Sequence, residues 1–225
     1  MSRRSLRASE RGFTLVELLV TISLFAVVMT LLTMMVVTLT HTFTRQETQQ
    51  DNSNEAALGM QRVGQVIRAG GVVSRGTQTL QAFAAGSRTS VSMHAYLDAD
   101  STPLAPTRVT IERSAAGELI ETRIEGRVAG GVWVFDRPPS RRQVIARDVA
   151  APGASVDGAT VPALFRYQLS NRTWVDRALT SAELADVVAV EVAISVQTNV
   201  SGGAPATRML RTFGLPNLTA TREVG

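Results

Sequence analysis

The sequence predicts an α+β fold, in which one long N-terminal α-helix packs on an antiparallel β-sheet head. A run without Asp, Glu, Lys or Arg covers residues 18–44, and the polar segment 45–54 that follows has neither proline nor glycine to end a helix. After Gly71 the apolar residues recur at every second position, which is the period of a strand. A helical period followed by a strand period, in separate parts of the chain, is typical of α+β proteins.

Composition limits the classes of function. A chain of 225 residues has room for one membrane segment and one globular domain. It has no cysteine, which excludes disulfides, thiolate metal sites and a cysteine nucleophile. The formal net charge is +4, but the first twelve residues contain four arginines and one glutamate, so the rest of the chain is nearly neutral. This charge distribution argues against a general electrostatic nucleic-acid binder.

Residues 13–44 are predicted to form a transmembrane helix, because about 20 apolar residues suffice to cross a bilayer. The run is too long for the core of a secretory signal peptide, and no small-residue cleavage site follows it. Gly12 stands before the run instead, so a cut between Gly12 and Phe13 would remove the basic leader 1–12 and keep the helix. An uncleaved signal anchor is the alternative. Either way, the arginines place the N-terminus in the cytoplasm and the head outside.

Glu17 is a carboxylate at the start of this apolar helix. A charge costs about 2.5–3.5 kcal/mol at the centre of a membrane helix and less near an end. The helix dipole returns only about 0.3–1 kcal/mol of that cost. A cut before Phe13 would create an α-amine that is mostly protonated at neutral pH. We predict that the amine of a neighbouring subunit neutralises Glu17 inside a helical bundle.

Residues 11–17, Arg-Gly-Phe-Thr-Leu-Val-Glu, resemble the prepilin signal of type IV pilins and type II secretion pseudopilins. The resemblance implies that a membrane prepilin peptidase cuts after Gly12 and methylates the amine of Phe13. It also implies that Glu17 recruits and registers the subunit in a filament, with other pilin or pseudopilin subunits and the inner-membrane assembly platform as partners. One departure is the absence of proline from Phe13 to Arg68, because many major pilins have a proline midway along this helix.

Residues 45–71 are predicted to continue the helix as an amphipathic segment. Ala56, Met60, Val63 and Ile67 recur at helical spacing, and Val66 widens this stripe. The stripe predicts packing against a sheet, and the glycine pair 70–71 predicts the end of the helix.

Residues 72–225 are predicted to form the β-rich extracytoplasmic head. The strongest alternation predicts that Val188, Val190, Val192, Ile194 and Val196 are buried and that Ala189, Glu191, Ala193, Ser195 and Gln197 are solvated. His94 alternates with the apolar face of its strand and is predicted to face solvent or to cap, and Glu121 alternates with Ile120 and Thr122. A capping box at Thr180-x-x-Glu183 predicts a single helical turn. Strands are predicted over 91–97, 132–135, 165–169, 188–197 and 208–212, and a hairpin over 108–112 and 120–125.

The sequence offers no constellation for catalysis or for binding a metal or other cofactor. Neither His41 nor His94 has a second histidine at metal-ligand spacing. Asp98 and Asp100 have the oxygen spacing of a calcium loop but lack its glycine and bidentate glutamate, so turn formation before Pro103 explains them better. No nucleophile elbow and no Ser/His/Asp set stand out. We therefore predict a protein that is not an enzyme.

The predicted function is that of a minor pilin or pseudopilin that helps initiate or cap a type IV pilus or a type II secretion pseudopilus. The helix end at 61–71 and the tail from Phe165 onward resemble minor pilin W and pseudopilin J proteins. The absence of a C-terminal disulfide loop also favours a minor subunit. Such a subunit starts as a single-pass protein of the inner membrane. The alternative is a membrane-anchored module that captures DNA through its densest basic cluster, formed by Arg137, Arg141, Arg142 and Arg147.

Overall fold

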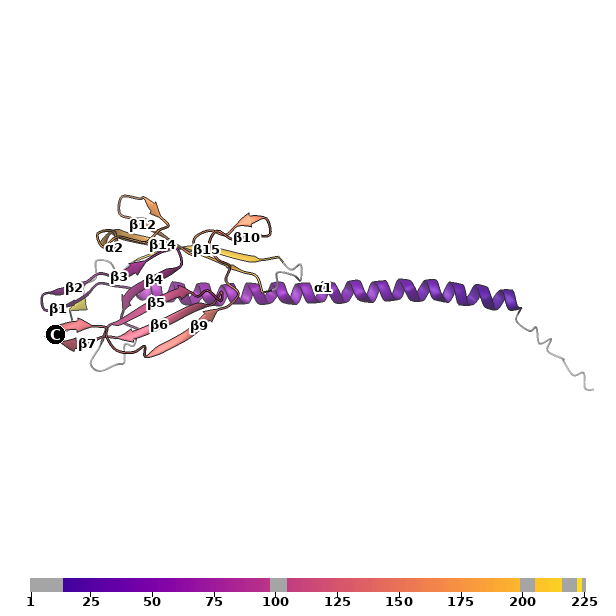
Figure 1. The fold of residues 1–225 in the computed structure, drawn as a ribbon, viewed down its shortest axis with the longest axis horizontal. Coiled ribbons are helices and arrows are strands. Elements are labelled where there is room, and N and C mark those ends of the chain that lie inside the picture. The colour runs from indigo at the N-terminus through magenta and orange to yellow at the C-terminus, as the bar shows by residue number, and fades with distance from the viewer. Residues whose placement is uncertain (1–13, 98–104, 199–204, 216–221, 224–225) are drawn as a thin grey trace, which may run out of the picture. The chain divides into compact units, whose positions relative to one another are not determined.

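The computed structural model describes residues 14–97, 105–198, 205–215 and 222–223. These residues have the predicted α+β architecture, one long helix followed by antiparallel sheets (Figure 1). The chain divides into two compact units, Met1–Gln46 and Glu47–Gly225.

Helix α1 spans Leu15–Ala69 without a break, so the prediction that the helix continues through the polar segment is confirmed. The weak helix formers at 51–54 do not interrupt it. The predicted stripe is buried: Ala56, Val63 and Ile67 are fully inaccessible to solvent, and Met60 and Val66 nearly so. The helix ends before the predicted glycine pair, where the Gly70 N–H donates to the Val66 carbonyl oxygen at 3.1 Å.

A five-stranded antiparallel sheet has the order β3-β4-β5-β6-β9. The predicted hairpin is confirmed, since β5 and β6 pair with Thr110 opposite Thr122. Gly117 has φ of +82°, a backbone conformation that favours glycine and closes the turn between the two strands. The strands of this sheet are β3 (Phe83–Gly86), β4 (Ser90–Ala95), β5 (Thr107–Arg113), β6 (Leu119–Glu125) and β9 (Arg141–Ala146).

A four-stranded antiparallel sheet has the order β13-β12-β14-β15. The predicted capping box before its longest strand is confirmed, because the Thr180 N–H donates to the Glu183 carboxylate at 2.8 Å and the Glu183 N–H to the Thr180 hydroxyl at 3.4 Å. The elements here are β12 (Phe165–Leu169), β13 (Trp174–Val175), α2 (Glu183–Asp186), β14 (Val187–Val196) and β15 (Thr207–Gly214).

Short strands complete the head. The segment β1 (Val73–Arg75) pairs with β2 (Gln78–Leu80) and, in parallel, with β16 (Arg222–Glu223). Two further hairpins are β7 (Arg127–Ala129) with β8 (Val132–Val134) and β10 (Ser155–Val156) with β11 (Ala159–Thr160).

The core lies between the second half of α1 and the two larger sheets. Tyr167 of β12 connects the sheets, because its fully buried hydroxyl lies 2.9 Å from the Ser90 carbonyl oxygen and accepts a hydrogen bond from the Ser87 N–H at 3.1 Å. Its ring meets Phe83 of β3 edge to face at 6.2 Å between centroids. Burial raises the pKa of this hydroxyl, which therefore stays neutral as a hydrogen-bonding group.

The prediction for the two faces of β14 was wrong at several positions. Ala193 and Ser195 are buried rather than solvated. Ser195 lies beside the β10–β11 hairpin, whose turn residue Asp157 accepts a hydrogen bond from the Ala206 N–H at 2.6 Å. Ala189 on the same face is also buried. Val188 is 37% exposed, because a bulge opposite Gln168 shifts the register and turns Val187 inward instead.

Two polar residues of the alternating strands, His94 and Glu121, are buried, so the prediction that His94 faces solvent was wrong. His94 is buried, and its ring packs against Phe135 with 5.0 Å between centroids. Its Nδ1–H donates to the Gln81 carbonyl oxygen at 2.7 Å. Glu121 is completely buried on the face of β6 that meets α1. Glu121 is satisfied by Arg62, 59 residues earlier, and His94 by the backbone of Gln81, 13 residues earlier, and a local alternation pattern reveals neither partner.

We expect the head to lose stability as the pH falls below about 6.5, the ordinary pKa of a histidine, because of His94. Burial lowers the pKa of His94, an effect that the nearby Arg108 adds to and the bond to Gln81 opposes. The unfolded chain therefore binds the proton first, so this contribution to stability is present above the unfolded pKa and is lost as pH falls toward the folded pKa. Thermal unfolding of the full chain in detergent measures the effect.

The matched control is His94→Asn, which keeps a donor near the position of Nδ1 but does not titrate. Its melting temperature is expected to change less over the same pH range. An identical pH dependence in the variant and the parent chain would contradict the assignment to His94.

Candidate functional site

The first turn of α1 holds the candidate assembly residue, Glu17. Thr14 caps the helix, because its hydroxyl accepts a hydrogen bond from the Glu17 N–H at 3.2 Å and its carbonyl oxygen accepts one from the Leu18 N–H at 3.1 Å. Glu17 therefore occupies the third helical position, where the positive end of the helix dipole favours a carboxylate. Its side chain is exposed, and no hydrogen bond or ion pair joins its carboxylate to another residue in the described part of the chain.

Gly12 and Phe13, the predicted cleavage and methylation sites, lie outside the described residues.

The apolar half of α1 exposes its large side chains all around the helix. Every large hydrophobic residue from Leu15 to Phe43 is at least 44% exposed, and α1 is long and apolar enough to cross a membrane. A helix that is hydrophobic on all sides is typical of a membrane span or of the core of a large bundle.

The hydroxyl side chains in this segment bond to the helix itself. Each donates to the carbonyl oxygen four residues earlier, as Thr30 does to Ala26 at 2.8 Å. No lipid-facing hydroxyl in this group needs a partner outside its own helix, so these polar residues are compatible with a hydrocarbon environment. The residues are Thr21, Ser23, Thr30, Thr33, Thr38, Thr40, Thr42 and Thr44.

A buried charge cluster in the head was not predicted from the sequence. Arg62 of α1 donates to both carboxylate oxygens of Glu121, from Nε at 2.5 Å and from Nη2 at 2.8 Å. The Nε of Arg123 donates to the same carboxylate at 2.6 Å. The side chain of Glu121 is 0% exposed, against 26% for Arg62 and 12% for Arg123. This cluster fixes α1 on β6, and nothing in it is arranged for chemistry.

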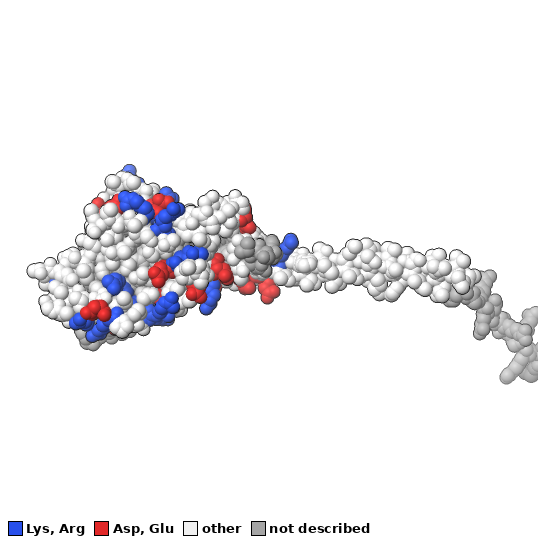
Figure 2. All heavy atoms as spheres, in the orientation of Figure 1, with Lys and Arg blue, Asp and Glu red and all other residues white. Residues whose placement is uncertain are grey.

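The arginines proposed for DNA capture do not form one basic surface. Arg141 and Arg142 are consecutive on β9, so their side chains leave opposite faces of the sheet. The Arg147 N–H donates to the Glu55 carboxylate at 2.6 Å, which places an acid beside this arginine. Acidic and basic side chains are interspersed on the face of the head that Figure 2 shows.

The candidate metal ligands give no site among the residues with described structure, where no group of three His, Asp or Glu side chains is close enough to hold an ion. His41 lies on the exposed part of α1, and His94 is buried in the head. Asp98 and Asp100 lie outside the described residues.

The N-terminal segment of the chain is similar to a known protein family. The family model described as the prokaryotic N-terminal methylation motif matches residues 7–33. The matched segment contains Gly12, Phe13 and Glu17 and the first half of the apolar run, and it ends before the head. No curated protein matches the chain.

Proposed function

We propose that this chain, with its prepilin-type methylation motif and its pilin-like α+β fold, is a pilin or pseudopilin that acts as a minor subunit of a type IV pilus or a type II secretion pseudopilus. The observation that supports the proposal most is the motif at 7–33 on a helix whose first half is apolar and exposed on all sides. The role is structural rather than enzymatic.

We propose that prepilin peptidase removes residues 1–12 by cutting between Gly12 and Phe13, and that the new amine of Phe13 is methylated. Residues 13–44 then hold the subunit in the inner membrane with the N-terminus on the cytoplasmic side. Residues 45–71 continue the helix into the extracytoplasmic head, 72–225. On assembly the apolar segment leaves the lipid and joins the core of the filament.

Glu17 is the proposed connector between subunits. Its backbone N–H is occupied by the Thr14 cap, while its carboxylate is exposed in the first turn. In an apolar bundle the protonated amine of a neighbour's Phe13 neutralises this carboxylate, which offsets the cost of removing both charges from water. The pair also sets the register of one subunit against the next.

The minor role is supported by the head. A chain without cysteine has no disulfide-closed C-terminal loop of the kind found in many major pilins. The layout of the tail, an aromatic strand followed by Trp174 and the long β14, is similar to that of minor pilin W and pseudopilin J proteins. We propose that the subunit initiates or caps the filament together with other minor subunits and the inner-membrane assembly platform.

Glu17→Gln tests this function. We expect the variant to insert in the membrane and to be processed normally, but to enter filaments at least about tenfold less, because the neighbour's amine would be left without its counter-charge. Quantitative immunoblotting of sheared filaments and membranes from cells that make the chain with its own filament system measures the ratio.

Two variants serve as controls. Glu47→Gln removes an exposed carboxylate of α1 beyond the apolar segment and should have no effect on incorporation. Gly12→Ala should retain the leader, seen by intact mass as a precursor that is never shortened. Incorporation of Glu17→Gln at the level of the parent chain would rule out the pairing.

A further inference from the structure

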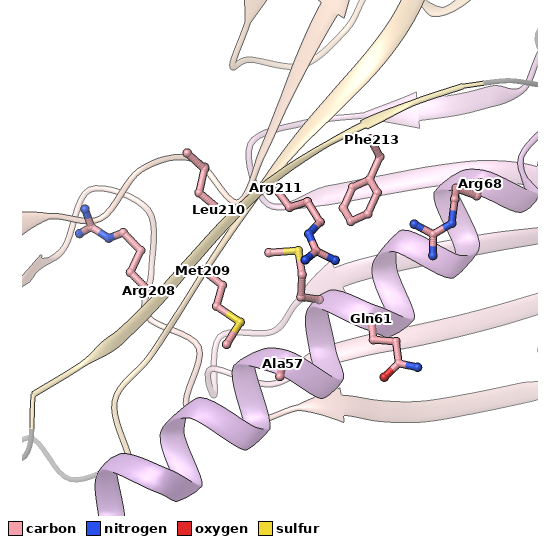
Figure 3. A pocket seen from close by; sticks show the side chains of 9 residues that line it. Ala57, Gln61, Arg68, Arg208, Met209, Leu210, Arg211 and Phe213 are labelled. Atoms are coloured by element: carbon pink, nitrogen blue, oxygen red, sulfur yellow. The ribbon is translucent and has the colours of Figure 1, made fainter.

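A groove of about 610 Å³ lies in the head between α1 and the strand β15 (Figure 3). Met209, Arg211 and Phe213 point from β15 toward the helix, and Leu210 points away from it. Met60 of α1, Met209 and Phe213 give the groove an apolar floor, and Arg68 and Arg211 add positive charge. None of the described residues that line the groove is acidic.

Among the described residues, no strand pairs with one edge of β15. This strand pairs with β14 on one side and is the last strand of the described sheet on the other. The Leu215 N–H donates to the Val188 carbonyl oxygen at 3.3 Å, and Phe213 lies opposite Val190. In an antiparallel pair the bonded residues alternate, so residues 213, 211 and 209 also bond to β14. The backbone groups of Arg208, Leu210 and Thr212 therefore point out of the sheet.

The unpaired edge of β15 lacks several of the features that usually prevent an edge strand from pairing with another chain. Proteins commonly shield an edge strand by shortening it, covering it or interrupting it with proline. The strand β15 is eight residues long, contains no proline, and exposes 60% of Leu210. Arg68 lies over the Phe213 ring at 5.5 Å, and Arg208 donates to the Thr160 carbonyl oxygen at 3.2 Å, so both guanidinium groups are held in place.

We propose that β15 is a docking strand, to which an extended, carboxylate-bearing segment of a neighbouring filament subunit adds as a further strand. Main-chain hydrogen bonds to Arg208, Leu210 and Thr212 hold the segment, as in other cases of strand addition. Its acidic side chains meet Arg211 in the groove, where charge-assisted bonds to arginine favour carboxylates over neutral groups. The proposal rests on the proposed function, since it takes the partner to be another subunit.

The test uses the full chain, in cells that assemble the filament, with a photo-crosslinking amino acid in place of Leu210. We expect a crosslinked product with another filament subunit, and mass spectrometry of the product should locate the crosslink in a segment containing Asp or Glu. In the same background, Thr212→Pro removes an N–H that points away from β14, so the sheet loses no bond while strand addition is blocked. Thr212→Ala keeps that N–H and is the matched control.

We expect Thr212→Pro to lower the crosslink yield about tenfold and Thr212→Ala to leave it unchanged. Arg211→Glu should lower the yield by a similar factor, because it reverses the charge in the groove. Arg142→Glu makes the same change at an exposed position of β9 and should have no effect. Thermal unfolding of each variant checks that the head remains folded.

Each other outcome overturns the inference. Suppose that the chain enters filaments, that Glu17→Gln lowers its incorporation, and that position 210 gives no crosslink. This result refutes the docking strand and leaves the proposed function standing. A product that nuclease removes identifies a nucleic acid, and a crosslink that survives both Thr212→Pro and Arg211→Glu shows contact without strand addition. Failure to enter filaments at all refutes the proposed function and this inference with it.

Discussion

Glu121→Ala is expected to lower the free energy of unfolding of the head by about 3–5 kcal/mol, the cost of breaking a buried ion pair by removing one partner. The carboxylate accepts hydrogen bonds from Arg62 and Arg123 and has no exposed surface. Without it, two guanidinium groups face each other across the junction of α1 and β6. The melting temperature of the full chain in detergent should fall by about 10 °C.

Glu112→Ala is the matched control, since it removes an exposed glutamate from the adjacent strand β5 and should change stability by less than about 0.5 kcal/mol. A second comparison replaces the whole cluster, with Glu121→Leu combined with Arg62→Met and Arg123→Met. This variant should recover much of the loss, because apolar residues of similar volume need no counter-charge. Equal melting temperatures for Glu121→Ala and Glu112→Ala would show that the cluster does not stabilise the head.

Tyr167→Ala is expected to cost about 3–5 kcal/mol, as for other large aromatic residues removed from a core. The side chain belongs to the four-stranded sheet, and its hydroxyl bonds to the turn between β3 and β4 of the five-stranded sheet. The substitution should therefore weaken the packing of the four-stranded sheet against the five-stranded sheet. Faster hydrogen exchange in β3 and β4, with β14 and β15 less affected, would identify this connection as the part that is lost.

Tyr167→Phe separates the ring from the hydroxyl. It keeps the edge-to-face contact with Phe83 and removes only the hydrogen bonds, so we expect a loss of about 1 kcal/mol. If Tyr167→Phe cost as much as Tyr167→Ala, the packing account of this position would be wrong.

The elements predicted correctly are those set by local periodicity. The stripe from Ala56 to Ile67, the hairpin around Gly117 and the long strand β14 each follow from spacing along a short stretch of chain. The motif around Gly12, Phe13 and Glu17 was likewise recognised because its residues are neighbours in sequence, and the family match covers them.

The features that were missed depend on contacts between distant segments. Glu121 meets Arg62 across 59 residues, and His94 lies against Phe135 from another part of the head. Ser195 is buried beside a hairpin whose turn residue Asp157 accepts a hydrogen bond from the Ala206 N–H. A polar residue in an alternating strand is expected to face water unless a partner is known, and the sequence does not show which partner the fold supplies.

The hydroxyl bonds within the apolar half of α1 bear on how a subunit changes its surroundings. Because Thr30 and the others donate to their own helix, the helix has the same hydrogen bonds in lipid as it has among protein helices. Moving it from one to the other exchanges dispersion contacts with acyl chains for dispersion contacts with side chains, two environments of similar polarity. The apolar surface therefore contributes little to the free energy of transfer from lipid to the filament core. In the proposed assembly, the charge of Glu17 in the first turn decides whether the helix is more stable in the filament or in the membrane. Without that charge, the free energies of the helix in the two environments would be nearly equal.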